Sequence, residues 1–421
     1  MFDFMDMDFN ESSTPPASGP YIPDAGECLR CGMCVSVCPT FRLFQTNEET
    51  PRSRLRTISK ILVENQGITA DERQHLDNCM QCRACETACP SKMAYGELFD
   101  QTQAQLQITP NWLGKLAFWF IENKRWRVRL MPWLAMYLKS GLQQPVRRTG
   151  LLKKMGMAEA EALLGRPALQ ALAAHYPASG ATRGKVALFT GCIAEHFDRE
   201  TLLAAIKLLN AIGYEVLIPP QQGCCGAIHQ HNGQSAAALI GNNISVFNGL
   251  DVDAVLHTAT GCGVMLSEYQ HEDAEAAGLF RRRLQDINGF LLAHWPDGLH
   301  LQALPEKVAV HEPCSQRNVL KNQQTVYSLL QKIPNLSIAA LPDNPICCGA
   351  GGSYMLTHPD NAKQLRGLKR QAITAAQADL VVSSNFGCAV FLNADADAGK
   401  VKHPLFILAR QLPAMPEYPY K

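Results

Sequence analysis

Two stretches decide the fold of this chain: Cys28-Leu-Arg-Cys31-Gly-Met-Cys34-Val-Ser-Val-Cys38-Pro39 and Cys79-Met-Gln-Cys82-Arg-Ala-Cys85-Glu-Thr-Ala-Cys89-Pro90. Both follow the spacing C-x2-C-x2-C-x3-C, with a proline after the last cysteine. Gaps of two residues let one tight loop turn three thiolates toward a common point, which is how a [4Fe-4S] cube is bound. The two stretches therefore predict two [4Fe-4S] clusters.

The assignment of ligands follows from the position of the fourth cysteine. In bacterial ferredoxins with this spacing, the fourth cysteine of each run ligates the other cluster. The expected ligands are Cys28, Cys31, Cys34 and Cys89 for cluster one, and Cys38, Cys79, Cys82 and Cys85 for cluster two. Structural zinc and disulfides are the alternatives, but a zinc site does not need a second matched run with a proline after its last ligand.

Composition limits the class of protein. The chain has 421 residues, of which 47% are apolar, and a net charge of +1, so we expect two to four domains and no nucleic-acid partner. Sixteen cysteines favour metal ligation in a reducing compartment. The start, MFDFMDMDFN, has no basic residue and predicts neither a signal nor a transit peptide. Because no apolar run is long enough for a membrane span, we expect a cytoplasmic protein, soluble or peripheral on the inner face of the membrane.

Taken in order, the sequence suggests five segments. These are a flexible tail (1–24), a helical ferredoxin-like domain (25–100), a helical connector (101–183) and two repeats (184–300 and 301–421). Between the cysteine runs, Leu55 to Asn65 is predicted to be a helix. Arg52 and Arg54 precede it, and we expect ordinary surface or interdomain contacts for them, with docking of a partner or compensation of cluster charge as the alternative.

The connector contains a regular series of tryptophans. They recur every seven residues, as Trp112, Trp119, Trp126 and Trp133. On one helix this spacing would place the first three rings on one stripe, with Pro132 interrupting the last step. The interleaved basic residues Lys124, Arg125, Arg127 and Arg129 allow an orientation in a membrane interface, with the cations toward the headgroups. Some of them fall beside the stripe, so packing against another domain or subunit is the favoured interpretation.

The remaining eight cysteines belong to an internal repeat. The first copy contains Cys192, Cys224, Cys225 and Cys262, and the second contains Cys314, Cys347, Cys348 and Cys388. Corresponding cysteines are 122, 123, 123 and 126 residues apart, a constancy that chance does not maintain. Each copy alternates predicted strands with predicted helices, which indicates short parallel sheets and an overall α/β fold of two pseudo-symmetric halves. The predicted strands are 185–190, 214–218 and 254–258 in the first copy, and 307–311 and 379–383 in the second. Cysteines on turns after such strands converge at the carboxyl edge of the sheet, where these folds bind ligands.

The chemistry of this second cysteine group stays open between two interpretations. Free cysteine is a common core residue, but the repeated C…CCG…C pattern favours metal ligation in at least one copy. Five histidines lie near the turns, and we expect them to orient thiolates or to pack rather than to catalyse: His196, His229, His231, His257 and His311. No catalytic residue is predicted.

At this level of detail the sequence resembles a known family, the iron-sulfur subunits of glycolate oxidase. Besides the two runs, the matching motifs are Pro51-Arg52-Ser53-Arg54, Gly223-Cys-Cys-Gly-Ala227, Gly261-Cys-Gly263, Cys347-Cys-Gly349 and Leu356-Thr-His-Pro-Asp360. The CCG repeats are shared with iron-sulfur subunits of anaerobic glycerol-3-phosphate dehydrogenase, lactate-utilisation complexes and heterodisulfide reductase. The resemblance implies a membrane-associated complex in which a flavoprotein subunit oxidises a 2-hydroxy acid and this chain passes the electrons toward quinone.

One departure from these relatives bears on the cofactors. In the heterodisulfide reductase relatives each repeat closes with CxxC, whereas here the closures read Cys262-Gly-Val-Met265 and Cys388-Ala-Val-Phe391. Four cysteines per copy still suffice for a cube, and we expect one additional cluster rather than two. Hydride abstraction needs an organic cofactor, and the chain has no convincing nucleotide motif, so FAD is expected in the partner. A glycerol-3-phosphate or lactate donor, and a CCG module without a redox role, remain alternatives.

Overall fold

The computed structural model describes residues 31–107, 109–394 and 401–413, so Cys28 and the predicted tail lie outside the described part. The N-terminal unit is helical, with α2 (Met33–Ser36), α3 (Pro39–Phe44), the 3-10 helix η1 (Asn47–Glu49), α4 (Pro51–Leu62), α5 (Ala70–Asp77), α6 (Ala84–Thr87) and α7 (Tyr95–Gln105). Helix α4 begins four residues before the predicted Leu55, because the Thr50 hydroxyl accepts a hydrogen bond from Ser53 N and Pro51 occupies the first helical position.

The connector folds differently from the prediction. It forms α8 (Trp112–Glu122), α9 (Lys124–Lys139), α10 (Gln143–Arg148), α11 (Leu151–Lys154) and α12 (Ala158–Ala162), followed by the short strand β1 (His175–Tyr176). The prediction of a tryptophan stripe on one helix is wrong, because the backbone leaves the helical conformation at Asn123 (ψ 83°), between α8 and α9. Trp119 and Trp126 instead meet across this break, with ring centroids 5.8 Å apart. Pro132 lies inside α9 and does not interrupt it.

Two small sheets form the body of the molecule. The first contains β1, β2 (Gly184–Phe189), β3 (Tyr214–Leu217), β4 (Ala254–His257) and β5 (Leu284–Asp286), in the order β1-β3-β2-β4-β5, with β1 antiparallel and the others parallel. The second contains β6 (Lys307–His311), β7 (Ser337–Ala340), β8 (Leu380–Ser383) and β9 (Val401–Lys402), in the order β7-β6-β8-β9, all parallel. The predicted α/β class with short parallel sheets is confirmed, and β3-β2-β4-β5 corresponds to β7-β6-β8-β9.

Helices cover both sheets. In the first repeat they are α13 (Ala194–Phe197), α14 (Arg199–Ala211), α15 (Ala227–His231), α16 (Ala237–Asn248), α17 (Thr260–Ser267), α18 (Ala274–Arg283) and α19 (Ile287–His294). In the second they are the π-helix η2 (Ser315–Leu320), α20 (Gln324–Leu330), α21 (Tyr354–Thr357), α22 (Pro359–Ala375), α23 (Phe386–Asn393) and α24 (Pro404–Arg410). One core unites the repeats, because Val186 and Leu256 of the first sheet and Val310 and Val382 of the second belong to the same buried cluster.

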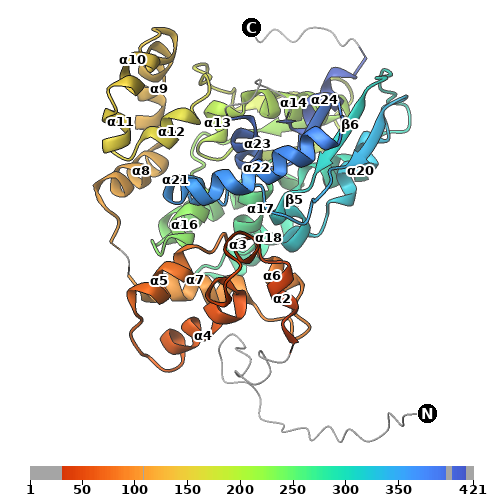
Figure 1. The fold of residues 1–421 in the computed structure, drawn as a ribbon. Coiled ribbons are helices and arrows are strands. Elements are labelled where there is room, and N and C mark those ends of the chain that lie inside the picture. Colours follow the sequence, from red (N-terminus) through yellow and green to blue (C-terminus); the bar gives the residue numbers. More distant parts are fainter. Residues whose placement is uncertain (1–30, 108, 395–400, 414–421) are drawn as a thin grey trace, which may run out of the picture.

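The N-terminal unit docks on the cysteine-bearing turns of the repeats. Figure 1 shows its red and orange helices at one end of the molecule, with the yellow connector helices along one side. Asn318 Nδ2 of η2 donates a hydrogen bond to the Cys82 carbonyl (2.7 Å), and Thr87 Oγ1 donates to the Asn318 carbonyl (3.1 Å). Arg83 forms an ion pair with Glu268 of the first repeat. The predicted boundary at residue 100 falls inside α7, so the five-segment division stays a prediction.

None of the helices in the described ranges is both long and apolar enough to cross a bilayer.

The shared core makes a testable prediction. Phe290 of α19 is buried in it and packs edge-on against Tyr214. We expect Phe290→Ala to lower the free energy of unfolding by about 3–5 kcal/mol and the midpoint of thermal unfolding by roughly 6–20 °C, in a single transition for both repeats. Leu203→Ala, at a half-exposed position on α14, is the control. Two separate transitions in calorimetry would contradict a common core.

Candidate metal centre

The two ferredoxin-type runs meet in the structure. Cys38, the last cysteine of the first run, lies within electrostatic reach of Cys79, Cys82 and Cys85. Burial raises the pKa of these three thiols, and for Cys82 and Cys85 neighbouring cysteines raise it further. Such buried thiols lose their protons when they bind a metal centre. The set predicted for cluster two therefore fits a four-thiolate centre, and every described cysteine is a free thiol.

A buried ion pair holds this set together. Arg54 of α4 pairs with Glu49, and its Nη1 atom lies 3.8 Å from Cys38 Sγ. Arg54 Nε donates to the His75 carbonyl (2.6 Å), and Glu49 Oε1 accepts from Asn78 Nδ2 (2.7 Å). Because these contacts join the end of the first run to the residues just before Cys79, the pair sets where the two runs meet.

The guanidinium of Arg54 places a positive charge beside the thiols of this set. Burial by itself would lower the pKa of Arg54, but the neighbouring Cys79, Tyr95, Cys38 and Glu49 outweigh burial and raise it. Arg54 is thus a permanent cation beside the sulfur of Cys38. The expectation of an ordinary surface or interdomain contact is wrong for Arg54, which is 2% exposed within the N-terminal unit.

The set predicted for cluster one is described in part. Cys31 is exposed, whereas Cys34 and Cys89 pack against the same small core as Cys85. Cys28 lies outside the described residues. The loop of this run turns at Gly32, which has a φ of 64°. The equivalent residue of the second run is Arg83, with a φ of 56°. Both runs therefore use a left-handed residue after their second cysteine, although only the first has a glycine there.

Backbone N–H groups point at sulfur atoms in both kinds of cysteine turn. The backbone N–H of Gln81 donates to Cys79, and that of Ala84 donates to Cys82. In the repeats, Gly226 N donates to Cys224 Sγ (3.4 Å) and Gly349 N to Cys347. Both glycines have a positive φ, near 90°. N–H donors of this kind stabilise negative charge on cluster sulfurs, which raises reduction potentials.

The first repeat gathers its four cysteines. The thiols form a hydrogen-bonded chain in the order Cys192, Cys224, Cys225, Cys262. Asn243 Nδ2 donates to the Cys224 carbonyl and Tyr269 Oη donates to the Cys225 carbonyl, which fixes the double-cysteine turn. Arg127 of the connector is buried within electrostatic reach of Cys192 and donates to the carbonyls of Phe120 and Ile121. It does not face outward as the membrane interpretation assumed.

The second repeat has the same arrangement of four thiols, and it lies next to the N-terminal unit. Its thiols are linked in the order Cys314, Cys347, Cys348, Cys388. Hydrogen bonds with Cys314 and Cys348 lower the pKa of Cys347. Cys82 of the predicted cluster two lies within electrostatic reach of both Cys347 and Cys314. The structure thus brings two of the predicted thiol sets side by side.

Charged and polar side chains surround the second set as well. Lys369 is fully buried and lies within electrostatic reach of Cys347, Cys348 and Cys388, while its Nζ donates to the Asp343 carbonyl (2.6 Å). Asn385 Nδ2 donates to Cys388 Sγ (3.2 Å). A buried ammonium offsets the charge of several thiolates in one place. The sequence reasoning missed Lys369.

The histidines fall into two groups. His311 has a ring nitrogen within 4.8 Å of Cys348 Sγ and Cys388 Sγ. Burial, then Lys369 and Arg317, lowers its pKa to about 3, so the imidazole is neutral. The other four contact groups other than thiols: His229 pairs with Glu122 (2.8 Å), His231 with Asp100 (3.1 Å) and His257 with Asp286 (3.9 Å), and the His196 carbonyl accepts from Ala168 N (2.7 Å).

Apolar side chains occupy the positions where a CxxC closure would place a fifth cysteine. Met265 and Phe391 are both buried, one in the core beside Cys224 and Cys225 and the other in the core beside Cys347 and Cys348. Arg366 lies over the Phe391 ring, 4.7 Å from its centroid. These packed side chains leave four thiols per repeat.

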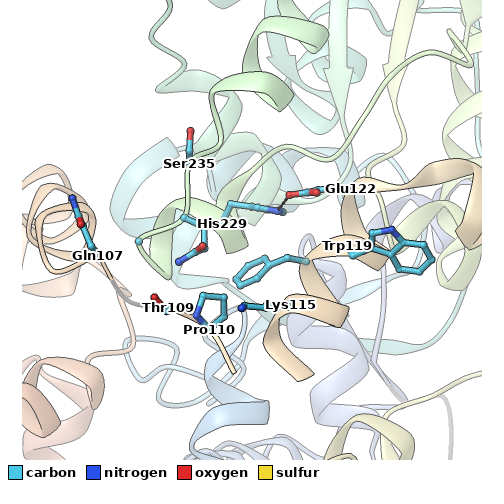
Figure 2. Close-up of a pocket in the computed structure, with 11 residues that line it drawn as sticks. Gln107, Thr109, Pro110, Lys115, Trp119, Glu122, His229 and Ser235 are labelled. Atoms are coloured by element: carbon cyan, nitrogen blue, oxygen red, sulfur yellow. Dashed lines mark hydrogen bonds and ion pairs between the residues drawn. The ribbon is translucent and has the colours of Figure 1, made fainter. Parts of the chain in front are cut away.

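A cavity of about 610 Å³ lies beside the first repeat (Figure 2). Its lining comes from α8, α15 and the segments next to them: Gln107, Thr109, Pro110, Lys115, Phe118, Trp119, Glu122, His229, Gly233, Gln234 and Ser235. The Phe118 ring packs on His229 with centroids 4.7 Å apart. Helix α15, which carries His229, begins directly after the Cys224-Cys225-Gly226 turn, so the cavity adjoins the segment that follows this turn.

Comparison with known proteins gives the family. The chain is 32% identical over 393 residues to "Probable glycolate oxidase iron-sulfur subunit" of Bacillus subtilis, covering 87% of this chain and 88% of that one. It is 30% identical over 406 residues to "Glycolate oxidase iron-sulfur subunit" of Escherichia coli, covering 91% and 93%. The chain belongs to the glycolate oxidase iron-sulfur subunit family. The predicted resemblance is confirmed.

Family profiles account for most of the chain. A 4Fe-4S dicluster domain matches residues 24–93, the linker region of the glycolate oxidase iron-sulfur subunit matches 109–164, and a cysteine-rich (CCG) domain matches 186–267 and 308–393. "Lactate utilization protein A" of Geobacillus thermodenitrificans is 25% identical and covers 53% of this chain and 95% of its own length. A hypothetical protein from Helicobacter pylori shares the fold, with a TM-score of 0.50 and 10% identity over 93% of this chain and 73% of that chain.

The Arg54–Glu49 pair predicts opposite shifts of the reduction potential in two variants. Arg54→Gln removes a cation beside Cys38 and leaves a buried carboxylate, so the reduction potential of the centre at this set should fall by about 60–130 mV. Glu49→Gln leaves the cation unbalanced and should raise the potential by a similar amount. Arg56→Gln, at an exposed position on the same helix, is the control. Redox titration followed by electron paramagnetic resonance (EPR) tests this, and equal shifts in both variants would contradict it.

Proposed function

We propose that this chain is the electron-transfer subunit of a complex in which a partner flavoprotein oxidises glycolate or another 2-hydroxy acid and quinone accepts the electrons. Family membership supports an iron-sulfur oxidoreductase component. A lactate or glycerol-3-phosphate donor is the second candidate. Of these two donors, the match to lactate utilization protein A favours lactate. The donor's pocket would belong to the partner, which would also carry FAD.

The observation that carries this proposal is the position of Cys82 against Cys314 and Cys347. When bound, iron-sulfur clusters accept and release single electrons and do not take up hydride. Hydrogen bonds from Asn318 to the Cys82 carbonyl and from Thr87 to the Asn318 carbonyl hold the two thiol sets beside each other. Two adjacent one-electron centres can pass electrons singly from a partner's flavin toward an acceptor.

The residues around the sets have a common electrostatic role. Arg54 lies beside the predicted cluster two, Lys369 lies beside the second repeat's thiols, and N–H donors point at sulfurs in each turn. All of these stabilise added negative charge in a buried site. We infer that they keep the centres reducible by a flavin, whereas a centre of four buried thiolates without such groups would have a lower potential.

The cavity beside His229 is our candidate for the acceptor's site. Its lining includes Phe118 and Trp119, whose flat apolar rings are of the kind that hold a planar ligand. Reduction of a quinone to a quinol consumes two electrons and two protons. The His229–Glu122 pair lies in the lining, and because the Glu122 side chain is 47% exposed, it connects the cavity with solvent protons.

The exposed tryptophans mark a contact face. Trp112 and Trp133 are 59% and 67% exposed on α8 and α9, and Trp119 and Trp126 are also exposed. Arg129 lies over the Trp126 ring, 5.4 Å from its centroid. We propose that this face packs against another subunit of the complex. Contact with a membrane is the alternative, and flotation of the isolated chain with anionic vesicles would favour it.

The cofactor content is the first prediction of this proposal. Anaerobically purified protein should contain about twelve irons and about twelve acid-labile sulfides, eight for the ferredoxin-type sets and four for a CCG set. Glycolate should bleach the iron-sulfur absorbance only when the flavoprotein is present, with lactate and glycerol-3-phosphate as competing donors. Zinc in place of the third set of irons, without electron transfer to quinone, would favour a binding module instead.

The acceptor's site gives a second prediction. We expect His229→Gln and Glu122→Gln to slow quinone reduction by roughly 10²–10⁴-fold, because each removes a proton-transfer group. Reduction of the centres by the donor should keep its wild-type rate in both variants, as stopped-flow absorbance would measure. His271→Gln, an exposed histidine of the same repeat, is the control. Unchanged quinone reduction in both variants would place the acceptor elsewhere.

A further inference from the structure

The second repeat contains a nitrogen atom among its sulfur atoms. One ring nitrogen of His311, Cys348 Sγ and Cys388 Sγ all lie within 4.8 Å of one another, and all three residues are buried. In the part of the chain that the structure describes, no other three His, Cys, Asp or Glu ligand atoms come this close. The remaining thiols of the repeat, Cys314 and Cys347, are hydrogen-bonded to this group through Cys348. His311 is therefore placed as a member of the donor set.

The imidazole ring is held in a fixed orientation. His311 ends β6 and pairs across the sheet with Ser383 of β8, and Ser383 Oγ lies 3.0 Å from His311 Nδ1. A histidine ligand commonly uses its second nitrogen for a hydrogen bond that sets its tautomer and orientation. With Nδ1 bonded to Ser383, Nε2 is the nitrogen available for a metal.

The first repeat provides an internal comparison. In its sheet the corresponding register pair is Phe189 and His257, so the histidine is on the other strand and a phenylalanine takes the place of His311. His257 Nδ1 lies 3.9 Å from Asp286 Oδ2, and the Gly263 backbone packs closely against its ring. The two repeats therefore differ in their donor sets, although their cysteines correspond one to one.

We propose that His311 is a direct ligand of the iron-sulfur centre of the second repeat, in a set with the neighbouring thiolates of Cys348 and Cys388, whereas the first repeat offers thiolates alone. This inference rests on the proposed function, since it requires a cluster in the second repeat. A neutral nitrogen in place of an anionic sulfur raises the reduction potential of a cluster. The second repeat, next to Cys82, becomes the higher-potential neighbour of the predicted cluster two.

The test uses the anaerobically purified full-length chain and pulsed EPR of the reduced protein. The signal of the second repeat is identified as the one that Cys348→Ser removes. We expect this signal to carry a strong hyperfine coupling to nitrogen that changes when histidine labelled with ¹⁵N in the imidazole ring is incorporated. His311→Cys should retain the signal, lose the coupling and shift to a lower potential. His257→Gln, which alters a buried histidine of the first repeat, should keep the coupling.

Two results overturn the inference and are distinguishable. If Cys348→Ser removes a signal and about four irons but histidine labelling leaves that signal unchanged, His311 is not a ligand and the electron relay stands. If Cys348→Ser removes neither iron nor a signal, the second repeat carries no cluster, and both the inference and the relay through this repeat fail. Because the labelling experiment uses the wild-type sequence, the absence of nitrogen coupling from every signal overturns the inference even where a variant does not fold.

Discussion

The buried pair of Arg54 and Glu49 is the interaction on which the rest of the site depends. Four thiolates in a dry interior repel one another, and a fixed cation beside them offsets that repulsion. Arg54 contacts Cys38 and the carbonyl of His75, and Glu49 contacts His75 and Asn78, so the pair also joins the two cysteine runs mechanically. Charge compensation and chain geometry are thus provided by the same two residues.

A similar principle recurs in the second repeat, with different residues. There Lys369 is the buried cation, and the Gly349 turn supplies the N–H donor that Gly226 supplies in the first repeat. In the first repeat the cation near the thiols is Arg127, which comes from the connector. The connector is therefore part of the first repeat's site, in addition to joining the N-terminal unit to the sheets. This gives a physical reason for its break at Asn123, which turns α9 so that Arg127 points inward.

Much of the fold followed from the sequence, because spacing and periodicity are local. The strands predicted from Lys185, Tyr214, Ala254, Lys307 and Asp379 begin and end within one residue of the observed ones. The strands β1, β5 and β9 have only two or three residues, and β7 has no buried residue, so none of them shows an apolar pattern. The cysteine sets were predictable from their repeats. Arg54 was not, since a charged residue at a helix start normally faces solvent; its register with Ile58 and Ile61 on the buried face of α4 was the available signal. His311 is among the histidines predicted to lie near the cysteine turns, but its place between Cys348 and Cys388, like the burial of Lys369, depends on long-range packing that no local pattern encodes.

The ferredoxin-type centre containing Cys82 and the centre of the second repeat should be close neighbours, and magnetic coupling between them tests this most directly. In EPR spectra of the fully reduced protein, the signal of the Cys82 centre should be broadened and should relax fast. It should become narrow and slowly relaxing in Cys348→Ser, where the second repeat's centre is absent. Identical spectra and relaxation in the two proteins would contradict the side-by-side arrangement and the relay derived from it.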